Sequence, residues 1–378
     1  MRVEKILFIG NTAWSMYNFR REVFLSFLKK GYEVNICAPY DEIFSKKIEE
    51  LGCRFTPVKL SAKGVNPIED IILMMRLFFL FRHMHPTFIF LYTIKPNIYG
   101  SIAAFFAGIP VIAITTGLGY TFLNKNFVAW ISRMLYKFAF RFPNEVWFLN
   151  QDDLNTFVES KLVFPEKAQL LKSEGINLEF FKPLPLLPVQ ESQNVSFLLC
   201  ARMLWDKGVG EFVKAAEILK KKYPHARFAL LGFVGINNPS AIQKEHLKQW
   251  VQKGFVEYLG VADDVRPVIQ QFDCIVLPSY YREGIPRSLM EGAAMEKILI
   301  TTNSVGCRDT VDNNVSGFLC NAKDVESLII CIEKVILLNK EKRLKMGYAG
   351  RMKMKNEFNI DFVIARYHEV LNKYILNY

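Results

Sequence analysis

The chain has 378 residues, 51% of them hydrophobic and 14% aromatic, and its formal net charge is +11 at pH 7. This length exceeds one ordinary domain, and the apolar content excludes an intrinsically disordered chain. The seven scattered cysteines include no CxxC pair, which argues against a disulfide scaffold or a structural zinc site and favours a reducing compartment. The charge implies an acidic partner, but does not choose among nucleic acid, a membrane surface and a phosphorylated substrate.

Short apolar runs alternate with longer amphipathic stretches along the first half of the chain. KILFIG (5–10) has too short an apolar stretch for a signal peptide and predicts a first strand, followed by a helix over 18–30. The pairing recurs as EVNICAP before DEIFSKKIEEL, and as TFIFLY before the stretch 97–106. Strands that alternate with helices predict a doubly wound parallel sheet with helices on both faces.

One segment, 96–124, carries no charged residue and is long enough to span a bilayer. Gly108 and Pro110 interrupt it, however, and VIAIT (111–115) is a β-rich run suited to a buried parallel strand. We therefore expect a soluble fold here and no transmembrane helix.

The same alternation of apolar runs and amphipathic stretches recurs in the second half, after FKPLPLLPVQESQN (181–194). The prolines of this stretch favour extended backbone and predict a hinge-like linker. Its apolar runs include VSFLLCA, RFALLG, CIVLPS and ILITT. We expect two α/β domains, over 1–183 and 184–359, and a C-terminal helix at about 360–378 that packs back on the first domain. Ligands bind beyond the carboxyl ends of the strands in such sheets.

The loop after VSFLLCA reads RMLWDKG and contains neither a GxGxxG nor a Walker pattern. Arg202 and Lys207 nevertheless stand beside Gly208 and a predicted helix start. Two fixed cations there can hold a diphosphate without a metal, through charge-assisted hydrogen bonds and the helix dipole. A solvated loop whose charges bind nothing fits the spacing equally well.

EGIPRSLME (283–291) joins the predicted strand CIVLPS to a predicted helix. Glu283 then lies at the end of the strand and Glu291 within the helix. Gly284 lets backbone amides approach a ligand closely, and Pro286 can start the helix without losing a hydrogen-bond donor. The alternative is that Glu283 is an ordinary acid near a helix start and Glu291 a surface residue.

In this order, the two motifs resemble the retaining GT-B glycosyltransferases of the family-four type, whose signature is a pair of glutamates at the spacing of Glu283 and Glu291. Further matches are FLNQDD (148–153), GINLEFFKP (175–183) and VGCRDTVDNNVSGFL (305–319), so the resemblance covers nearly the whole chain. It implies an α/β fold of the GT-B type, with two Rossmann-like domains facing across a deep cleft. The first domain would bind the acceptor and the second the nucleotide sugar.

The resemblance also implies how the second domain binds its donor. Glu291 would accept hydrogen bonds from the ribose hydroxyls and Glu283 from the hydroxyls of the transferred sugar. Arg202 and Lys207 would neutralise the departing diphosphate, which makes them and Glu283 the expected catalytic residues. We expect no metal and no cofactor, because fixed cations can replace a divalent ion and no DxD stands at a convincing strand end. The expected donor-binding residues are Arg202, Lys207, Glu283, Gly284, Ile285, Pro286 and Glu291.

The first domain should then hold the acceptor. Its stretches TIKPNIYGS (93–101) and TTGLGYTF (115–122) are similar to those of the relatives that build lipid-linked oligosaccharides and O-antigens. Lys95 reads as a lone cation after a buried strand, which suits a phosphate contact as well as it suits a solvated lysine. The first loop lacks the glycine-rich form of many relatives, so its aromatic residues would stack on an acceptor sugar or simply pack. The expected acceptor-binding residues are Lys95, Gly117, Gly119, Trp14 and Tyr17.

The implied function is a retaining glycosyltransferase that moves a hexose or N-acetylhexosamine from a UDP-sugar to an undecaprenyl-diphosphate-linked saccharide, as in bacterial polysaccharide or lipopolysaccharide assembly. Two alternatives remain. A GT-B-like sugar-nucleotide epimerase would want catalytic histidines in the cleft, and the histidine positions argue against it. A non-enzymatic nucleotide or nucleic-acid binder would spread its basic residues over a polar face, whereas here they interleave with large apolar residues. We therefore expect no nucleic-acid partner.

That mixture recurs in NFVAWISRMLYKFAFR (126–141), where Arg133, Lys137 and Arg141 form one helical stripe, and in IILMMRLFFLFR (71–82). Such stretches suit a membrane interface, because apolar groups enter the acyl boundary while cations meet anionic lipid. We expect a cytoplasmic protein that associates peripherally with the inner face of the cytoplasmic membrane through its first domain. The alternative is an ordinary helix with a buried apolar side and solvated cations.

Overall fold

The chain divides into two compact units, Met1–Gly175 with Ile360–Tyr378, and Ile176–Asn359. The division lies before the boundary we expected at residue 183, because Ile176 and Phe181 are buried in a core of the second unit. The structure is a computed structural model, and it describes residues 4–60, 66–117, 127–184 and 194–375.

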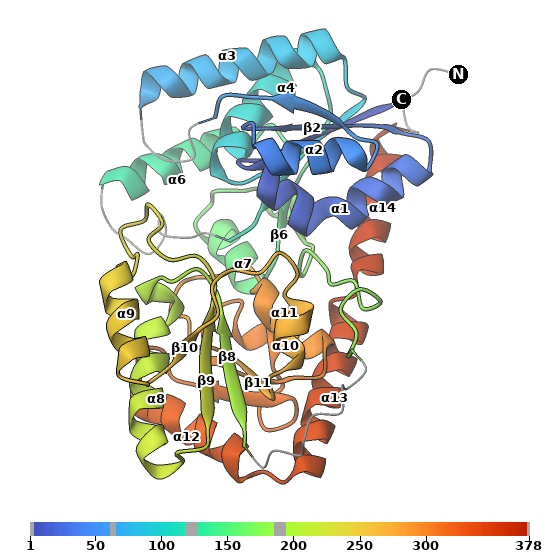
Figure 1. The fold of residues 1–378 in the computed structure, drawn as a ribbon. Coiled ribbons are helices and arrows are strands. Elements are labelled where there is room, and N and C mark those ends of the chain that lie inside the picture. Colours follow the sequence, from blue (N-terminus) through green and yellow to red (C-terminus); the bar gives the residue numbers. More distant parts are fainter. Residues whose placement is uncertain (1–3, 61–65, 118–126, 185–193, 376–378) are drawn as a thin grey trace. The chain divides into compact units, whose positions relative to one another are not determined.

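The first unit is built on a parallel sheet of seven described strands in the order β3-β2-β1-β4-β5-β6-β7 (Figure 1). Its central strands are buried on both faces, which explains why they read as nearly continuous apolar runs. The strands are β1 (Lys5–Ile9), β2 (Glu33–Ala38), β3 (Arg54–Pro57), β4 (Phe88–Tyr92), β5 (Val111–Thr115), β6 (Glu145–Phe148) and β7 (Ala168–Leu170).

Side chains alternate along these strands, so that Leu7 and Ile9 of β1 belong to one core and Ile6 and Phe8 to another. Helices α3 (Pro67–Met84), α4 (Ser101–Ala107), α6 (Phe127–Ala139) and α7 (Gln151–Glu159) cover the first core. Helices α1 (Ala13–Lys29), α2 (Glu42–Glu50) and α14 (Ile360–Ile375) cover the second, and Figure 1 shows α1 beside α14. Helix α1 begins at Ala13, earlier than the start that we expected at residue 18. It begins there because the Thr12 side chain caps it by accepting a hydrogen bond from the Ser15 amide.

The uncharged segment contains short elements. A single π-helical turn, Pro96–Gly100, leads into α4, which ends at Gly108 in the left-handed conformation before β5 begins. Within the described parts of the chain, no helix is long and apolar enough to cross a membrane.

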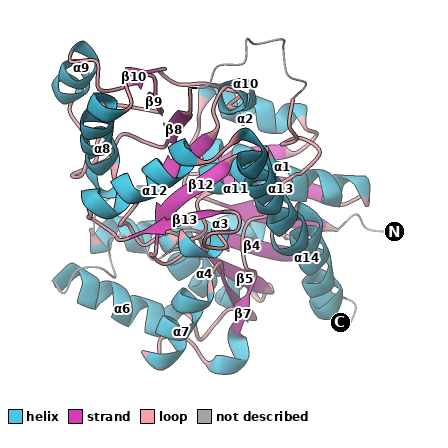
Figure 2. Cartoon of the chain, turned by 90° about the horizontal axis from the view of Figure 1, so that it is seen from below, coloured by secondary structure: helices cyan, strands magenta, loops and turns pink. Residues whose placement is uncertain are grey.

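The second unit contains a parallel sheet of six described strands in the order β10-β9-β8-β11-β12-β13. They are β8 (Ser196–Cys200), β9 (Arg227–Leu231), β10 (Glu257–Tyr258), β11 (Cys274–Leu277), β12 (Ile298–Thr302) and β13 (Gly317–Cys320). Helices α8 (Val209–Lys222), α9 (Lys244–Gln252) and α12 (Val325–Leu337) cover one face, and Figure 2 shows α8 beside α12. Helices α10 (Arg266–Gln270), α11 (Arg287–Ala294) and α13 (Lys340–Glu357) cover the other. The predicted class, two doubly wound parallel α/β halves, is confirmed.

Candidate active site

Three loops of the second unit meet beyond the carboxyl ends of their strands: 201–208 after β8, 278–286 after β11, and 303–307 after β12. Glycine permits this meeting. Gly208 has φ of +75°, and an added Cβ would collide with the carbonyl oxygen of Pro278. Gly306, with φ of +76°, stands in the same relation to the carbonyl oxygen of Gly284. The backbone itself therefore holds the two predicted motifs side by side.

Lys207 and Glu283 are joined directly in this arrangement. The Lys207 ammonium pairs with the Glu283 carboxylate, and only 13% and 11% of the two side chains are exposed. Arg202, from the same loop as Lys207, is exposed. The structure thus brings two of the three predicted catalytic residues into contact, at the place where a ligand of a parallel sheet is expected.

Glu291 lies one turn into α11, where it accepts a hydrogen bond from Arg287 at 3.1 Å. Pro286 precedes the helix as its N-cap residue. Burial raises the pKa of the Glu291 carboxyl, and the charge of Arg287 only partly opposes this effect. The pKa of Cys200, at the end of β8, is raised to about 12 by burial and by the charge of Glu291.

Two residues that the sequence analysis did not single out connect the loops. The Ser279 side chain is fully buried, and its Oγ lies 3.0 Å from Oε1 of Glu283. The carbonyl oxygen of Asp206 accepts hydrogen bonds from the amides of Tyr280 and Tyr281, at 3.1 and 3.2 Å. Burial raises the pKa of the Asp206 carboxyl, and its Oδ1 has no hydrogen-bond partner among the described residues. Ser279 ends an apolar run and Asp206 is one acid among charges, so neither had a distinctive signal in the sequence.

In the first unit, Lys95 is neither a lone cation nor a solvated lysine, and both of those interpretations are wrong. Its Nζ lies 2.8 Å from Oδ1 of Asp70, whose other oxygen accepts a hydrogen bond from the Tyr99 hydroxyl at 2.8 Å. Asp70 is 8% exposed, on the inner side of α3. A buried carboxylate thus compensates the Lys95 charge, while a phosphate contact by Lys95 stays a prediction.

The other predicted acceptor residues lie in different surroundings. Gly117 follows β5 with φ of +119°, and Gly119 lies outside the described residues. Trp14, in the first turn of α1, is 40% exposed and meets Phe19 edge to face. Tyr17 is half-buried, with its ring 5.9 Å from that of Phe44. Trp14 is thus the more exposed of the two rings, and stacking on an acceptor sugar stays a prediction for both.

Helices α3 and α6 bury one apolar side in the core and also expose large apolar side chains together with cations, so the membrane-interface prediction and its alternative both stay open. On α6, Trp130, Met134 and Phe138 are 58%, 51% and 51% exposed, and Arg133, Lys137 and Arg141 are exposed as well. A shallow hollow of about 580 Å³ marks the outer side of α3. It is lined by Ile71, Ile72, Met75, Arg76, Phe79, Leu80 and His83.

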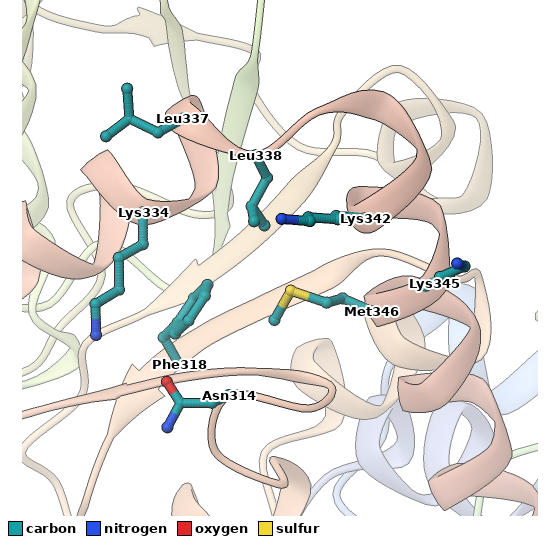
Figure 3. A pocket seen from close by; sticks show the side chains of 8 residues that line it. All are labelled: Asn314, Phe318, Lys334, Leu337, Leu338, Lys342, Lys345 and Met346. Carbon is teal, nitrogen blue, oxygen red and sulfur yellow. The ribbon is translucent and has the colours of Figure 1, made fainter.

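A second hollow, of about 530 Å³, lies in the second unit near the amino end of β13 (Figure 3). Figure 3 shows Met346 pointing toward Phe318, and Lys342 reaching toward Leu338. The lining residues are Asn314, Phe318, Lys334, Leu337, Leu338, Lys342, Lys345 and Met346. None of them belongs to either predicted motif, so this hollow is separate from the candidate active site.

The converging loops can therefore recognise a ligand that carries both anionic groups and hydroxyls. Lys207 supplies a sheltered cation, and the carboxylates of Glu283 and Glu291 supply acceptors. Among the described residues, no group of three His, Cys, Asp or Glu side chains is placed to hold a metal ion. Metal independence remains a prediction.

Two family models match the chain, "Glycosyl transferases group 1" over residues 189–353 and "Glycosyl transferase 4-like" over residues 5–150. The N,N'-diacetylbacillosaminyl-diphospho-undecaprenol alpha-1,3-N-acetylgalactosaminyltransferase of Campylobacter jejuni is 29% identical, over 99% of this chain and 100% of that protein. The UDP-Gal:alpha-D-GlcNAc-diphosphoundecaprenol alpha-1,3-galactosyltransferase of Escherichia coli is 24% identical, over 83% and 81%.

Solved structures share the fold at lower identity. A glycosyltransferase from Rickettsia africae superimposes with a TM-score of 0.82 at 18% identity, covering 100% of both chains. HepE from Anabaena, in complex with UDP, superimposes with a TM-score of 0.77 at 16% identity, covering 98% of this chain and 100% of that one.

Proposed function

We propose that the chain, a member of the group 1 glycosyl transferases, moves a hexose or N-acetylhexosamine from a UDP-sugar to an undecaprenyl-diphosphate-linked saccharide. The transfer would retain the anomeric configuration of the sugar and would need no metal. The reaction would serve the assembly of a bacterial surface glycan. The names of the Campylobacter and Escherichia coli relatives support this acceptor class, since both contain a sugar linked to diphosphoundecaprenol.

One observation carries the proposal for the donor. A sheltered lysine and two sheltered carboxylates meet at the carboxyl edge of one parallel sheet, with Lys207 against Glu283 and Glu291 on the helix that follows. A nucleotide sugar needs this combination of groups. Its diphosphate needs a cation. Its ribose hydroxyls and sugar hydroxyls need hydrogen-bond acceptors, and an ionised carboxylate is an acceptor only.

In the proposed reaction, the bond between the sugar C1 and the diphosphate oxygen breaks as the acceptor hydroxyl oxygen bonds to C1 on the same face. The departing phosphate takes the acceptor proton, so the protein need not supply a base. Lys207, with Arg202, would stabilise the charge that develops on the diphosphate, and Glu283 would orient the sugar. EDTA should leave such a reaction nearly unchanged.

We also propose that the first unit lies on the cytoplasmic face of the inner membrane, where a polyprenyl diphosphate is anchored. The support is the exposed apolar and basic surface of α3 and α6, in which Trp130 and Phe79 stand out beside Arg133 and Arg76. Large exposed apolar patches with basic rims are typical of interfacial binding.

The decisive experiment offers purified protein a panel of UDP- and GDP-sugars with an undecaprenyl-diphosphate-linked acceptor. We expect transfer from a UDP-hexose or UDP-N-acetylhexosamine, an α-linked product by NMR from an α-linked donor, and little change on addition of EDTA. Exclusive use of GDP-sugars, an inverted product, or loss of activity in EDTA with recovery in manganese would each overturn the corresponding part of the proposal.

A further inference from the structure

Ser279, at the carboxyl end of β11, has a side chain with 0% exposure. Its Oγ lies 3.0 Å from Oε1 of Glu283 and 3.1 Å from the carbonyl oxygen of Asp206, and it accepts from the Tyr281 amide at 3.2 Å. A hydroxyl has one proton to donate, and a carboxylate is a stronger acceptor than a neutral carbonyl. The proton of Ser279 is therefore directed to Glu283.

Lys207 also pairs with that carboxylate. In the proposed function Lys207 neutralises the donor diphosphate, and a ligand that draws its ammonium away takes this cation from Glu283. Only 11% of the Glu283 side chain is exposed, so water compensates the loss poorly. Ser279 stands on a different loop from Lys207 and can keep its hydrogen bond through this exchange.

We propose that Ser279 is a positioning residue, which holds the Glu283 carboxylate in place when Lys207 turns to the donor diphosphate. This inference rests on the proposed function, in which Glu283 receives the hydroxyls of the transferred sugar. A carboxylate held from one side presents its remaining lone pairs in a fixed direction, as selective recognition of a hydroxyl requires. Ser279 should therefore matter more for transfer of the sugar than for binding of UDP.

The test compares Ser279→Ala with Ser196→Ala, a matched control at the amino end of β8, where another serine donates to the Asp273 carboxylate at 2.7 Å. In Ser279→Ala we expect kcat to fall about tenfold or more, since a hydrogen bond to a charged group is lost. The Kd for UDP, measured by calorimetry, should rise by a smaller factor than kcat falls, because UDP draws Lys207 away from Glu283 but makes no contact with Glu283 itself in this assignment.

Two further results complete this comparison. Ser279→Thr keeps the hydroxyl and should recover most of the activity, and Ser196→Ala should leave kcat unchanged. A Ser279→Ala enzyme with wild-type kcat contradicts the inference. So does one that loses UDP affinity in step with kcat, because that pattern indicates a collapsed loop.

A readout without substrate separates this inference from the proposed function. Lys207→Met removes the ammonium as a ligand would, so its crystal structure should show Glu283 still at Ser279. In Lys207→Met/Ser279→Ala the Glu283 side chain should leave that position. An unchanged Glu283 in the double variant overturns the positioning role, whatever the reaction. Displaced Glu283, together with a wild type that uses no UDP-sugar, would refute the proposed function alone.

Discussion

Lys207 pairs with Glu283 although 76 residues separate them and they belong to loops after different strands. In the proposed function they bind different parts of the donor, the diphosphate and the transferred sugar. The site thus neutralises its own cation, and a diphosphate has to compete with a carboxylate for Lys207. Removing either residue also leaves the other sheltered charge without its partner, which is costly in itself.

Lys207→Met should slow sugar transfer by about 100- to 1,000-fold, because one fixed charge at the developing anion is lost. Initial rates of transfer from the preferred UDP-sugar give kcat/KM for this comparison. Lys214→Met on α8, a lysine whose side chain is 57% exposed, is the control and should keep the wild-type rate. Equal rates for the two variants would show that Lys207 does not contact the diphosphate.

Glu291 should make donor affinity depend on pH. Burial raises the pKa of its carboxyl above the ordinary value of 4.5, and only the ionised form accepts from both ribose hydroxyls. Affinity for UDP should therefore be complete above the raised pKa and fall as the pH drops through it, at a pH above 4.5. Calorimetric titrations of UDP across this range measure the effect. Glu291→Gln should bind more weakly at neutral pH and lose this pH dependence; an unaltered profile contradicts the ribose assignment.

The two sheets could be predicted from the sequence because parallel strands are buried on both faces and stand out as apolar runs. The two donor motifs were likewise visible, since each follows such a run. The partners of the predicted residues were not. Asp70 precedes Lys95 by 25 residues on another element, so only the packing of α3 on the sheet brings them together. Ser279 reads as the end of a strand, and its hydrogen bond to Glu283 depends on the conformation of the intervening loop.

Arg20 should contribute strongly to the stability of the first unit. Its guanidinium pairs with Glu174 and lies 4.0 Å above the ring of Tyr92, and only 5% of the side chain is exposed. Arg20→Met leaves the Glu174 carboxylate without its partner, which should lower the free energy of unfolding by about 3–5 kcal/mol. Chemical denaturation monitored for the first unit measures the change. Arg20→Met/Glu174→Gln should recover part of the loss; a double variant as unstable as the sum of the single ones would argue against a direct pair.

Glu145 should make the attachment of α14 sensitive to acid. Burial alone would raise the pKa of its carboxyl, but hydrogen bonds from Lys373 and Trp147 and the charge of Arg366 outweigh burial and lower the pKa below 4.5. A carboxyl with a lowered pKa in the folded state contributes stability that is present above pH 4.5 and lost as the pH falls through the lowered value. Glu145→Gln should be less stable than the wild type at pH 7 and should approach it in acid. Thermal unfolding at several pH values measures this, and a constant difference would refute it.

The apolar and basic surface of α3 and α6 should bind anionic vesicles at low salt. Replacing Arg133, Lys137 and Arg141 by Gln removes three cations worth about 1 kcal/mol each near an anionic surface, so binding should weaken about 100-fold. The control replaces three exposed lysines of α13, in the other unit, by Gln: Lys340, Lys342 and Lys345. This variant loses the same amount of charge and should bind the vesicles as the wild type does.

An apolar variant tests the other half of this interface. Trp130→Ser/Phe138→Ser keeps every cation, and both side chains are more than half exposed, so the fold loses little packing. Because exposed aromatic groups enter the acyl boundary, this variant should lose most of its binding to vesicles of phosphatidylglycerol and phosphatidylcholine. Each variant should keep wild-type activity on a short soluble acceptor, since the converging loops of the second unit are untouched. Two results would contradict this prediction: a wild type that does not bind anionic vesicles at low salt, or an α13 control that loses as much binding as the α6 variant. In either case the surface is an ordinary solvated face, and the acceptor lipid reaches the enzyme by another route.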